Sequence, residues 1–220
     1  MNTGIAELDK IININESKLI MLGGKAASGK STMLENLIYN IAIKQNIKTV
    51  LFNLESSKDK IILDLKNIDK NDKLKSGNYE NISGSIIKLL NTNLFIEDMP
   101  KITVKEIENN IKNLKNKYNI KFVGIDYLQL VVLSKDSKLD KQEEMLEIMK
   151  QLKDISLKYQ VIILVVTVIS CDTNDIKELT KKNYAQYANT ILILNQDKLN
   201  NVEIIIAKNN TDKLGTLKME

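Results

Sequence analysis

Apolar residues gather in short runs along this chain, and polar segments separate the runs. The runs are rich in Ile, Leu and Val and lack strict alternation with polar residues, which is typical of strands covered on both faces of a sheet. We therefore predict strands at residues 18–22, 49–54, 94–98, 121–126, 161–167, 190–194 and 202–208.

Helical periodicity appears between several of the predicted strands. Thr103 and Glu106 form a capping box, which predicts a helix start, and an apolar stripe with helical spacing follows. A second stripe runs from Met145 to Tyr159, and residues 31–43 also have a helical pattern. We interpret both stripes as core-facing. They consist of Ile107, Ile111, Leu114 and Tyr118, and of Met145, Ile148, Met149, Leu152, Ile155 and Tyr159.

The alternation of strands and helices predicts an α/β fold with a mostly parallel central sheet flanked by helices. We expect the last two strands, followed by residues 215–219, to close as a C-terminal antiparallel hairpin. The 220 residues contain one proline and neither repeats nor a low-complexity tract. This organisation predicts a single domain over residues 1–220.

Composition narrows the chemistry that the chain can perform. All 32 basic residues are lysines, so no guanidinium is available for bidentate recognition. The chain has no histidine and only Cys171, which excludes an internal disulfide and favours a metal with oxygen ligands, Mg²⁺ above all. The net charge of +4 permits a polyanionic partner without requiring one. Because no apolar run reaches membrane-spanning length, we expect no membrane partner and a cytoplasmic location.

The most informative motif follows the first predicted strand. Gly24, Gly29, Lys30 and Ser31 fit the P-loop pattern G-x-x-x-x-G-K-[ST], between a strand and a helical pattern as this loop requires. Backbone amides and the helix N-terminus then face phosphate oxygens, Lys30 reaches the terminal phosphates, and Ser31 ligates Mg²⁺. The residues expected to bind ATP are Gly24, Lys25, Ala26, Ala27, Ser28, Gly29, Lys30, Ser31 and Thr32.

Two acidic residues end or follow other predicted strands. Asp126 ends one strand, where its carboxylate is expected to hold the metal. Glu55 follows the strand after the P-loop helix, where a carboxylate can polarise an attacking water. Each alone is an ordinary polar residue at a strand end, but together with the P-loop they predict a hydrolytic nucleotide site.

Several motifs resemble the C-terminal ATPase domain of the DnaB-type replicative helicases, a RecA-like P-loop fold. They are TGIAELD near the N-terminus, the P-loop, NLES, IDYLQL, EIMKQLKDIS and VEIIIAKNN, and the resemblance runs from Thr3 to about Met219. It implies a hexameric ring that moves along single-stranded DNA with ATP bound between subunits. It also implies that Glu55 is the catalytic base, that Lys30 takes part in catalysis, and that Asp126 is the Walker B acid.

The chain also departs from the family pattern. Where the family has a Gln that senses the terminal phosphate, this chain has Val168 in TVISC. The family's hairpin also offers a lysine and an arginine finger to the neighbouring nucleotide, and here the positions read Lys208, Asn209 and Asn210. Because such a finger accelerates turnover by about 10³ to 10⁵, we expect slow hydrolysis unless Lys208 or Lys213 compensates.

Other expectations concern partners. The DNA-contacting loop of the family corresponds to LTKKN, which leaves Lys181 and Lys182 as candidate contacts to single-stranded DNA. A helicase loader or primase is a further expected partner. The family's N-terminal domain, which braces the ring, is expected to be absent, so we expect a monomer or weak oligomer that forms rings with ATP and DNA.

Two alternative functions stay open on the sequence. One is a RadA- or KaiC-like ATPase of the RecA family, although RadA itself is disfavoured because zinc-finger cysteines are missing before the P-loop. The other is a nucleotide-binding module that regulates a helicase or loader without hydrolysing ATP. Val168 and Asn210 favour that second alternative, whereas Glu55 argues against it.

Overall fold

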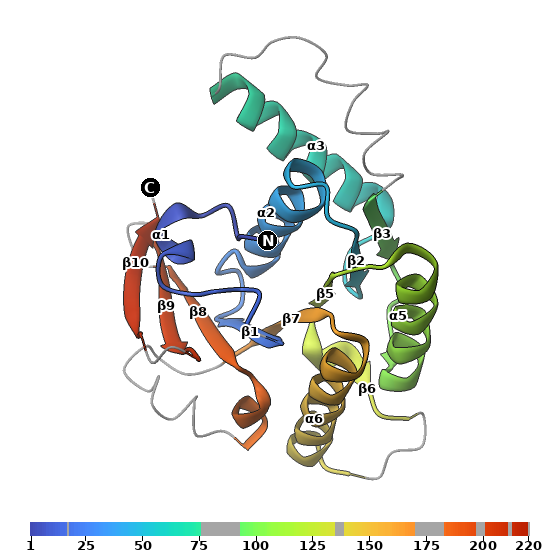
Figure 1. Cartoon of the computed structure of the whole chain (residues 1–220). Coiled ribbons are helices and arrows are strands. Elements are labelled where there is room, and N and C mark those ends of the chain that lie inside the picture. Colours follow the sequence, from blue (N-terminus) through green and yellow to red (C-terminus); the bar gives the residue numbers. More distant parts are fainter. Residues whose placement is uncertain are drawn as a thin grey trace.

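An eight-stranded sheet forms the centre of the computed structural model, which describes residues 1–16, 18–75, 93–134, 139–169, 183–196, 201–210 and 213–219 (Figure 1). Its strand order is β10-β9-β8-β1-β7-β5-β2-β3. The strands are β1 (Leu19–Gly24), β2 (Thr49–Asn53), β3 (Leu94–Glu97), β5 (Phe122–Asp126), β7 (Ile162–Val168), β8 (Thr190–Gln196), β9 (Val202–Lys208) and β10 (Gly215–Met219). Every predicted strand is therefore confirmed, and the strand ends differ from the prediction by at most two residues.

Parallel pairing joins the six strands from β8 to β3, whereas β8, β9 and β10 pair antiparallel. This arrangement confirms the predicted mostly parallel sheet with a C-terminal hairpin. The first strand lies between β7 and β8, and its last residue, Gly24, is opposite Val168 on one side and Leu194 on the other. All six residues of β1 are buried, which explains its continuous apolar pattern.

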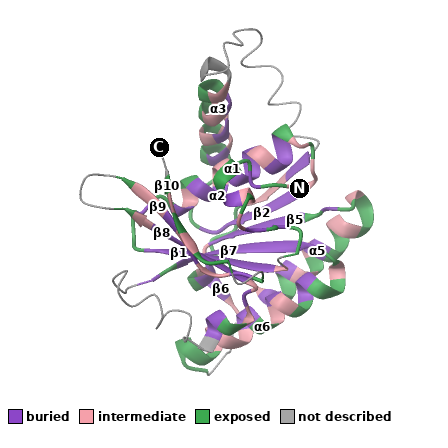
Figure 2. Cartoon of the chain, turned by 60° about the vertical axis from the view of Figure 1, so that its left-hand side comes forward, coloured by how far each residue is buried: buried purple, intermediate pink, exposed green. Residues whose placement is uncertain are grey.

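Helices cover both faces of the sheet (Figures 1 and 2). One face packs against α5 (Val104–Tyr118) and α6 (Lys141–Tyr159), whose apolar stripes join one core cluster as predicted. The other packs against α2 (Lys30–Ile38), its π-helical continuation η1 (Tyr39–Lys44) and α3 (Lys58–Lys75). Shorter elements are α1 (Ala6–Asp9), β4 (Ile102–Thr103), η2 (Leu128–Leu130), β6 (Val131–Val132) and η4 (Asn183–Tyr187).

The helix α3 has no counterpart among the elements predicted from the sequence. Its buried apolar residues Ile61 and Leu65 stand among many lysines and aspartates, so its apolar stripe is narrow.

Gly124 in β5 explains how closely α2 approaches the sheet. A Cβ atom at this glycine would lie only 3.2 Å from side-chain carbons of Leu34 and Leu51. The absence of a side chain at Gly124 thus lets Leu34 of α2 pack directly against β5.

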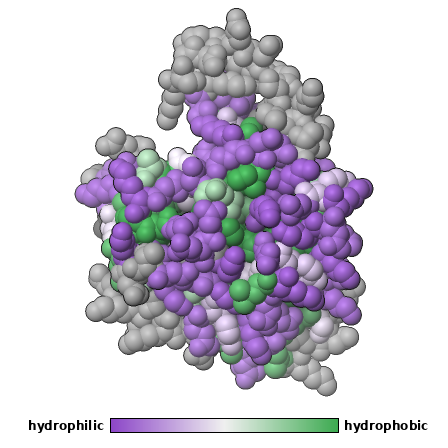
Figure 3. All heavy atoms as spheres, in the orientation of Figure 1, coloured by the Kyte–Doolittle hydropathy of each residue, from purple (hydrophilic) through white to green (hydrophobic). Residues whose placement is uncertain are grey.

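Hydrophilic side chains cover most of the described surface on the face seen in Figure 3, where hydrophobic ones form small patches. Among the described residues, no helix combines the length and the apolar character needed to cross a membrane.

The predicted capping box at the start of α5 is present. The Thr103 hydroxyl accepts a hydrogen bond from the backbone N–H of Glu106 at 3.2 Å, and the Glu106 carboxylate accepts one from the N–H of Thr103 at 2.8 Å. Together these bonds satisfy two amides that the helix itself leaves without partners.

We predict that Thr103→Ala lowers the free energy of unfolding by about 1 kcal/mol, because the substitution removes the cap acceptor. Urea denaturation followed by circular dichroism measures this difference. Lys105→Ala, at an exposed position of the same first turn, is the control and is expected to have little effect. Equal stability of Thr103→Ala and wild type would show that the cap contributes nothing.

Candidate nucleotide site

The loop between β1 and α2 turns sharply at the edge of the sheet. A Cβ atom at Gly24 would lie 2.5 Å from the Ser28 hydroxyl oxygen and 2.7 Å from the carbonyl oxygen of Leu194, so only glycine fits. Further along the loop, Ala27 and Gly29 have φ values of 59° and 84°. Gly29 is also the N-cap of α2. The N-terminus of α2 therefore opens at the loop, where its unpaired amides and helix dipole favour a bound phosphate.

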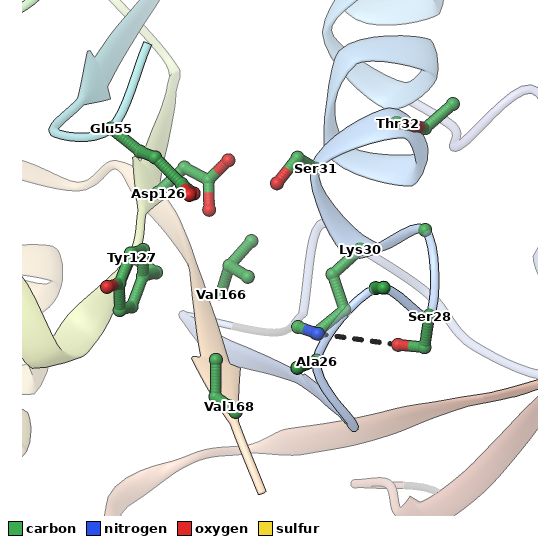
Figure 4. Close-up of a pocket in the computed structure, with 12 residues that line it drawn as sticks. Ala26, Ser28, Lys30, Ser31, Thr32, Glu55, Asp126, Tyr127, Val166 and Val168 are labelled. Atoms are coloured by element: carbon green, nitrogen blue, oxygen red, sulfur yellow. Dashed lines mark hydrogen bonds between the residues drawn. The ribbon is translucent and has the colours of Figure 1, made fainter.

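Lys30 is the cation of this loop and is buried, with 7% of its surface exposed. Its ammonium donates hydrogen bonds to the carbonyl oxygen of Lys25 and, at 3.3 Å, to the Ser28 hydroxyl (Figure 4). Burial lowers the pKa of Lys30, while the charges of Asp126 and Glu55 oppose that shift. The loop thus positions a desolvated cation whose interaction with an anion is strong.

Asp126 lies at the end of β5 and is 3% exposed. Burial raises the pKa of this carboxyl, as does Glu55, whereas the Ser31 hydroxyl and Lys30 lower it. Figure 4 shows the oxygens of Ser31 and Asp126 facing each other across the cleft. A hydroxyl and a carboxylate are oxygen ligands that suit Mg²⁺ when phosphate and water complete its shell.

Glu55 reaches the same edge of the sheet through a local turn. The side-chain oxygen of Asn53, the last residue of β2, accepts hydrogen bonds from the N–H groups of Glu55 at 3.1 Å and Ser56 at 2.8 Å. Asn53 pairs with Asp126 in the sheet, and the Leu54 N–H donates to the Asp126 carbonyl at 2.7 Å. The turn therefore holds the exposed carboxylate of Glu55 beside Asp126 (Figure 4).

These side chains line one cleft of about 490 Å³. Val168, at the end of β7, also faces it and is 39% exposed, so an apolar side chain occupies the position where the sequence suggested a missing phosphate sensor. The complete lining is Ala26, Ala27, Ser28, Gly29, Lys30, Ser31, Thr32, Glu55, Asp126, Tyr127, Val166 and Val168. Among the described residues, no group of three or more His, Cys, Asp or Glu side chains gathers as a metal site.

Sequence reasoning did not foresee the position of Gln129. Its side-chain amide donates hydrogen bonds to the Thr167 hydroxyl and the Val168 carbonyl oxygen, both at 3.0 Å. The residue therefore ties η2 to the end of β7 and fixes the backbone beside the cleft. The motif IDYLQL draws attention to Gln129, but its partner on a distant strand is visible only in the fold.

A second cavity of about 690 Å³ lies on the other side of the P-loop and shares Ser28, Gly29 and Thr32 with the first. Polar side chains of α2 and η1, among them Asn36 and Asn40, contribute to its wall. This space adjoins the phosphate loop and is the larger of the two cavities.

The remaining predicted site residues lie elsewhere. Lys208 is the last residue of β9 and is opposite Ile191, near the start of β8. It therefore lies at the amino ends of the parallel strands, whereas the P-loop lies at their carboxyl ends. Asn210 lies near this edge too, where its amide donates a hydrogen bond to the Glu16 carbonyl at 3.1 Å. Lys208 is therefore not part of the cleft of its own chain. Lys181 and Lys182 lie outside the described residues.

A P-loop between β1 and α2, with one acidic residue at the end of β5 and another just after the adjacent strand β2, defines the class of P-loop nucleotide-binding proteins. The chain belongs to the DnaB-like helicase C terminal domain family, whose family model matches residues 1–220. This membership decides against the RadA- or KaiC-like alternative.

Comparisons with individual proteins agree with the family match. The chain is 27% identical to the replicative DNA helicase DnaB of Geobacillus stearothermophilus over 244 residues, covering 99% of this chain and 53% of that relative. It thus spans about half the length of the curated relatives that it matches.

Solved structures share the RecA-like ATPase fold. One solved ATPase domain superposes with a TM-score of 0.81 at 20% identity, covering 99% of this chain and 86% of that one. A DnaB-like replicative helicase, solved to show its interactions with primase, superposes with a TM-score of 0.78 at 21% identity, covering 99% and 58%.

The carboxyl of Glu35, one helical turn after Ser31, generates a prediction about pH. Burial and the charges of Asp64 and Asp126 raise its pKa from 4.5 to about 7, against the opposing charge of Lys60. A carboxyl whose pKa is higher in the folded state binds more protons there, so stability falls as pH rises from about 4.5 to about 7.

We expect Glu35→Gln to be more stable than wild type at pH 8, by roughly 1 kcal/mol because water screens the half-exposed group, and to differ less at pH 5. Urea denaturation at the two pH values measures this difference. Glu7→Gln, at an exposed position of α1, is the control. A gain of equal size at both pH values would contradict the assignment to Glu35 ionisation.

Proposed function

We infer that this chain is the ATPase domain of a DnaB-like replicative helicase that binds and hydrolyses ATP with Mg²⁺ to move along single-stranded DNA. The observation that carries this proposal is the convergence of Lys30, Ser31, Asp126 and Glu55 on one cleft at the mouth of a P-loop. Family membership supports the same activity.

The residues of the cleft divide the chemistry among them. The amides at the start of α2 and the ammonium of Lys30 hold the phosphates, and Lys30 opposes the charge that develops during phosphoryl transfer. Ser31 and Asp126 would hold Mg²⁺, and the bound metal would supply positive charge that neutralises the phosphates. The Glu55 carboxylate orients a water and accepts its proton. The cavity beyond Thr32 has room for the nucleoside.

Catalysis is weak in this proposal. Val168 offers no hydrogen bond to the terminal phosphate, and the chain contains no arginine that can act as a finger. Lys208 and Lys213 are the hairpin cations that can reach a neighbouring nucleotide in its place. A ring of subunits, a hexamer by family resemblance, brings the two surfaces together. Single-stranded DNA contacts Lys181 and Lys182, and a primase or helicase loader is a further partner.

A second candidate function is a module that binds nucleotide without hydrolysing it and regulates a helicase or loader. The apolar Val168 in the cleft and the neutral Asn210 favour it. The carboxylate of Glu55 beside Asp126 favours hydrolysis, because a module that only binds has no need of a base at this position.

Lys30→Ala is expected to weaken the binding of a fluorescent ATP analogue with Mg²⁺ by about 10- to 100-fold, because it removes a buried charge that faces phosphate. Fluorescence anisotropy measures the affinity, and a thermal melt verifies folding. Lys10→Ala, an exposed lysine after α1, is the matched control. Equal affinity of the Lys30 variant and wild type would show that the site is wrongly assigned.

Restoring an arginine is expected to raise turnover. In assembled subunits with single-stranded DNA, Asn210→Arg should increase ATP hydrolysis by about tenfold or more, since a complete finger contributes about 10³ to 10⁵. Phosphate release measures the rate. Asn210→Ala controls for the lost bond to Glu16, and Glu55→Gln should abolish the gain without weakening nucleotide binding. An unmodified chain that equals a typical ring helicase would contradict the proposed weakness.

A further inference from the structure

The strands β5 and β7 separate at their carboxyl ends, beside the nucleotide cleft. Their parallel ladder ends with Ile125 opposite Val165. One residue further, β5 ends at Asp126 and the chain turns towards η2, whereas β7 continues to Val168. The end of β7 therefore extends past its ladder with β5.

The side-chain amide of Gln129, in η2, takes the place of a neighbouring strand at this point. It donates hydrogen bonds to the Val168 carbonyl oxygen and the Thr167 hydroxyl, both at 3.0 Å, and its oxygen accepts one from the Val168 N–H at 3.5 Å. A primary amide carries both a donor and an acceptor, as a peptide group does, so it can pair with both backbone groups of Val168. Gln129 thus continues the backbone pairing of β7 where β5 has turned away.

The opposite side of the same β7 segment is bonded to the P-loop. The N–H of Ile169 donates to the Gly24 carbonyl oxygen at 3.1 Å, and Gly24 is opposite Val168 in the ladder with β1. The Val168 carbonyl and the Ile169 N–H belong to one peptide group, which is therefore bonded at both ends. Bonds in such a line polarise and strengthen one another. Gln129 thus connects η2, through the end of β7, to the first glycine of the P-loop.

This end of β7 forms one wall of the nucleotide cleft. Val166 and Val168 line the cleft together with Lys30, Asp126 and Glu55, and Figure 4 shows both valines on β7. A shift of the strand end would move this apolar wall relative to the two carboxylates. Gln129 itself is exposed and is not among the residues that line the cleft.

We propose that Gln129 is a positioning residue for ATP hydrolysis, because it holds the end of β7 and with it the wall that Val166 and Val168 form beside Asp126 and Glu55. The proposal rests on the proposed ATPase function and adds a residue that acts through the backbone of β7. Gln129 acts on the wall and does not contact the nucleotide, so its loss changes the rate of hydrolysis and leaves the affinity for ATP in place.

A fixed wall matters because hydrolysis depends on where a single water is held. Glu55 orients that water best in a volume from which competing waters are excluded, and the two valines supply an apolar side of this volume. A displacement of about 1 Å can lower turnover by about 10²-fold. A polar side chain at position 168 could be held by the phosphate, whereas valine makes no such bond. The position of Val168 therefore depends on the contacts of its backbone, which Gln129 provides.

Kinetics of single substitutions test the proposal. Gln129→Met keeps the length of the side chain but removes its donor and acceptor, and it should lower kcat by about tenfold while the affinity for a fluorescent ATP analogue with Mg²⁺ stays within about twofold of wild type. Gln129→His should recover part of the rate at pH 8, because a neutral imidazole retains one N–H donor. Phosphate release and fluorescence anisotropy measure the two quantities.

Gln151→Met is the matched control for the loss of an amide hydrogen bond. Gln151 lies on α6, outside the residues that line the cleft, and its side-chain amide donates to the Glu147 carboxylate at 2.9 Å. Its substitution removes a bond of comparable length from the same type of side chain. The kcat of this variant should equal that of wild type.

Hydrogen exchange separates a positioning role from a general loss of stability, and it requires no hydrolysis. In Gln129→Met the N–H groups of Val168 and Ile169 should exchange about tenfold faster than in wild type, because the end of β7 is released locally. The N–H groups of β1 and β5 should exchange as in wild type, and the melting temperature should stay close to the wild-type value.

The outcomes separate this proposal from the proposed function. An unchanged kcat in Gln129→Met, in a chain whose hydrolysis depends on Lys30 and Glu55, overturns the positioning role alone. A lower kcat with an equal loss of analogue affinity, or with faster exchange throughout β1 and β5, also overturns it, because the bonds of Gln129 then only stabilise the fold. A wild-type chain that binds the analogue independently of Lys30 overturns the proposed function and, with it, a role of Gln129 in hydrolysis.

Discussion

The close contact between the P-loop and the end of the sheet is the constraint on which the rest of the site depends. Gly24 allows this contact, because any side chain at that position would overlap Ser28 and the Leu194 carbonyl. The contact fixes the start of α2 over the carboxyl ends of β1 and β5, and Gly124 lets the same helix lie close to the sheet. As a result the amides of α2, Lys30 and Asp126 face one small volume.

Burial then sets the electrostatics of that volume. The apolar strands on both sides of β1 and β5 exclude water, so the charges of Lys30 and Asp126 are poorly solvated and their pKa values move in opposite directions. Such a site favours ligands that supply compensating charge, which a nucleotide triphosphate with a divalent cation provides.

The two ends of the parallel strands carry different charges. The phosphate loop, Asp126 and Glu55 lie at the carboxyl ends of the parallel strands. At the amino ends lie Lys18, Lys153 and Lys208, which have no carboxylate partners in the described segments. The sequence contains no arginine, so each basic side chain on either side is a lysine, a point charge instead of a planar fork.

The sequence by itself determined the strands of the sheet and their order along the chain, the helices α2, α5 and α6, and the phosphate loop. These features follow from local patterns, namely continuous apolar runs, a capping box at Thr103 and the glycine spacing around Lys30. Glu55 and Asp126 were predictable as well, because parallel strands present their carboxyl ends at one edge.

Only the tertiary structure decided which residues meet across the chain. Two hydrogen bonds join segments far apart in sequence, namely Gln129 in η2 with β7 and Lys153 in α6 with Asn189. No local pattern encodes these contacts, because each results from the strand order and from the way α6 packs beside η4. For the same reason the position of Lys208 follows from the antiparallel course of β9, which carries this lysine to the amino ends of the parallel strands and away from the P-loop of its own chain.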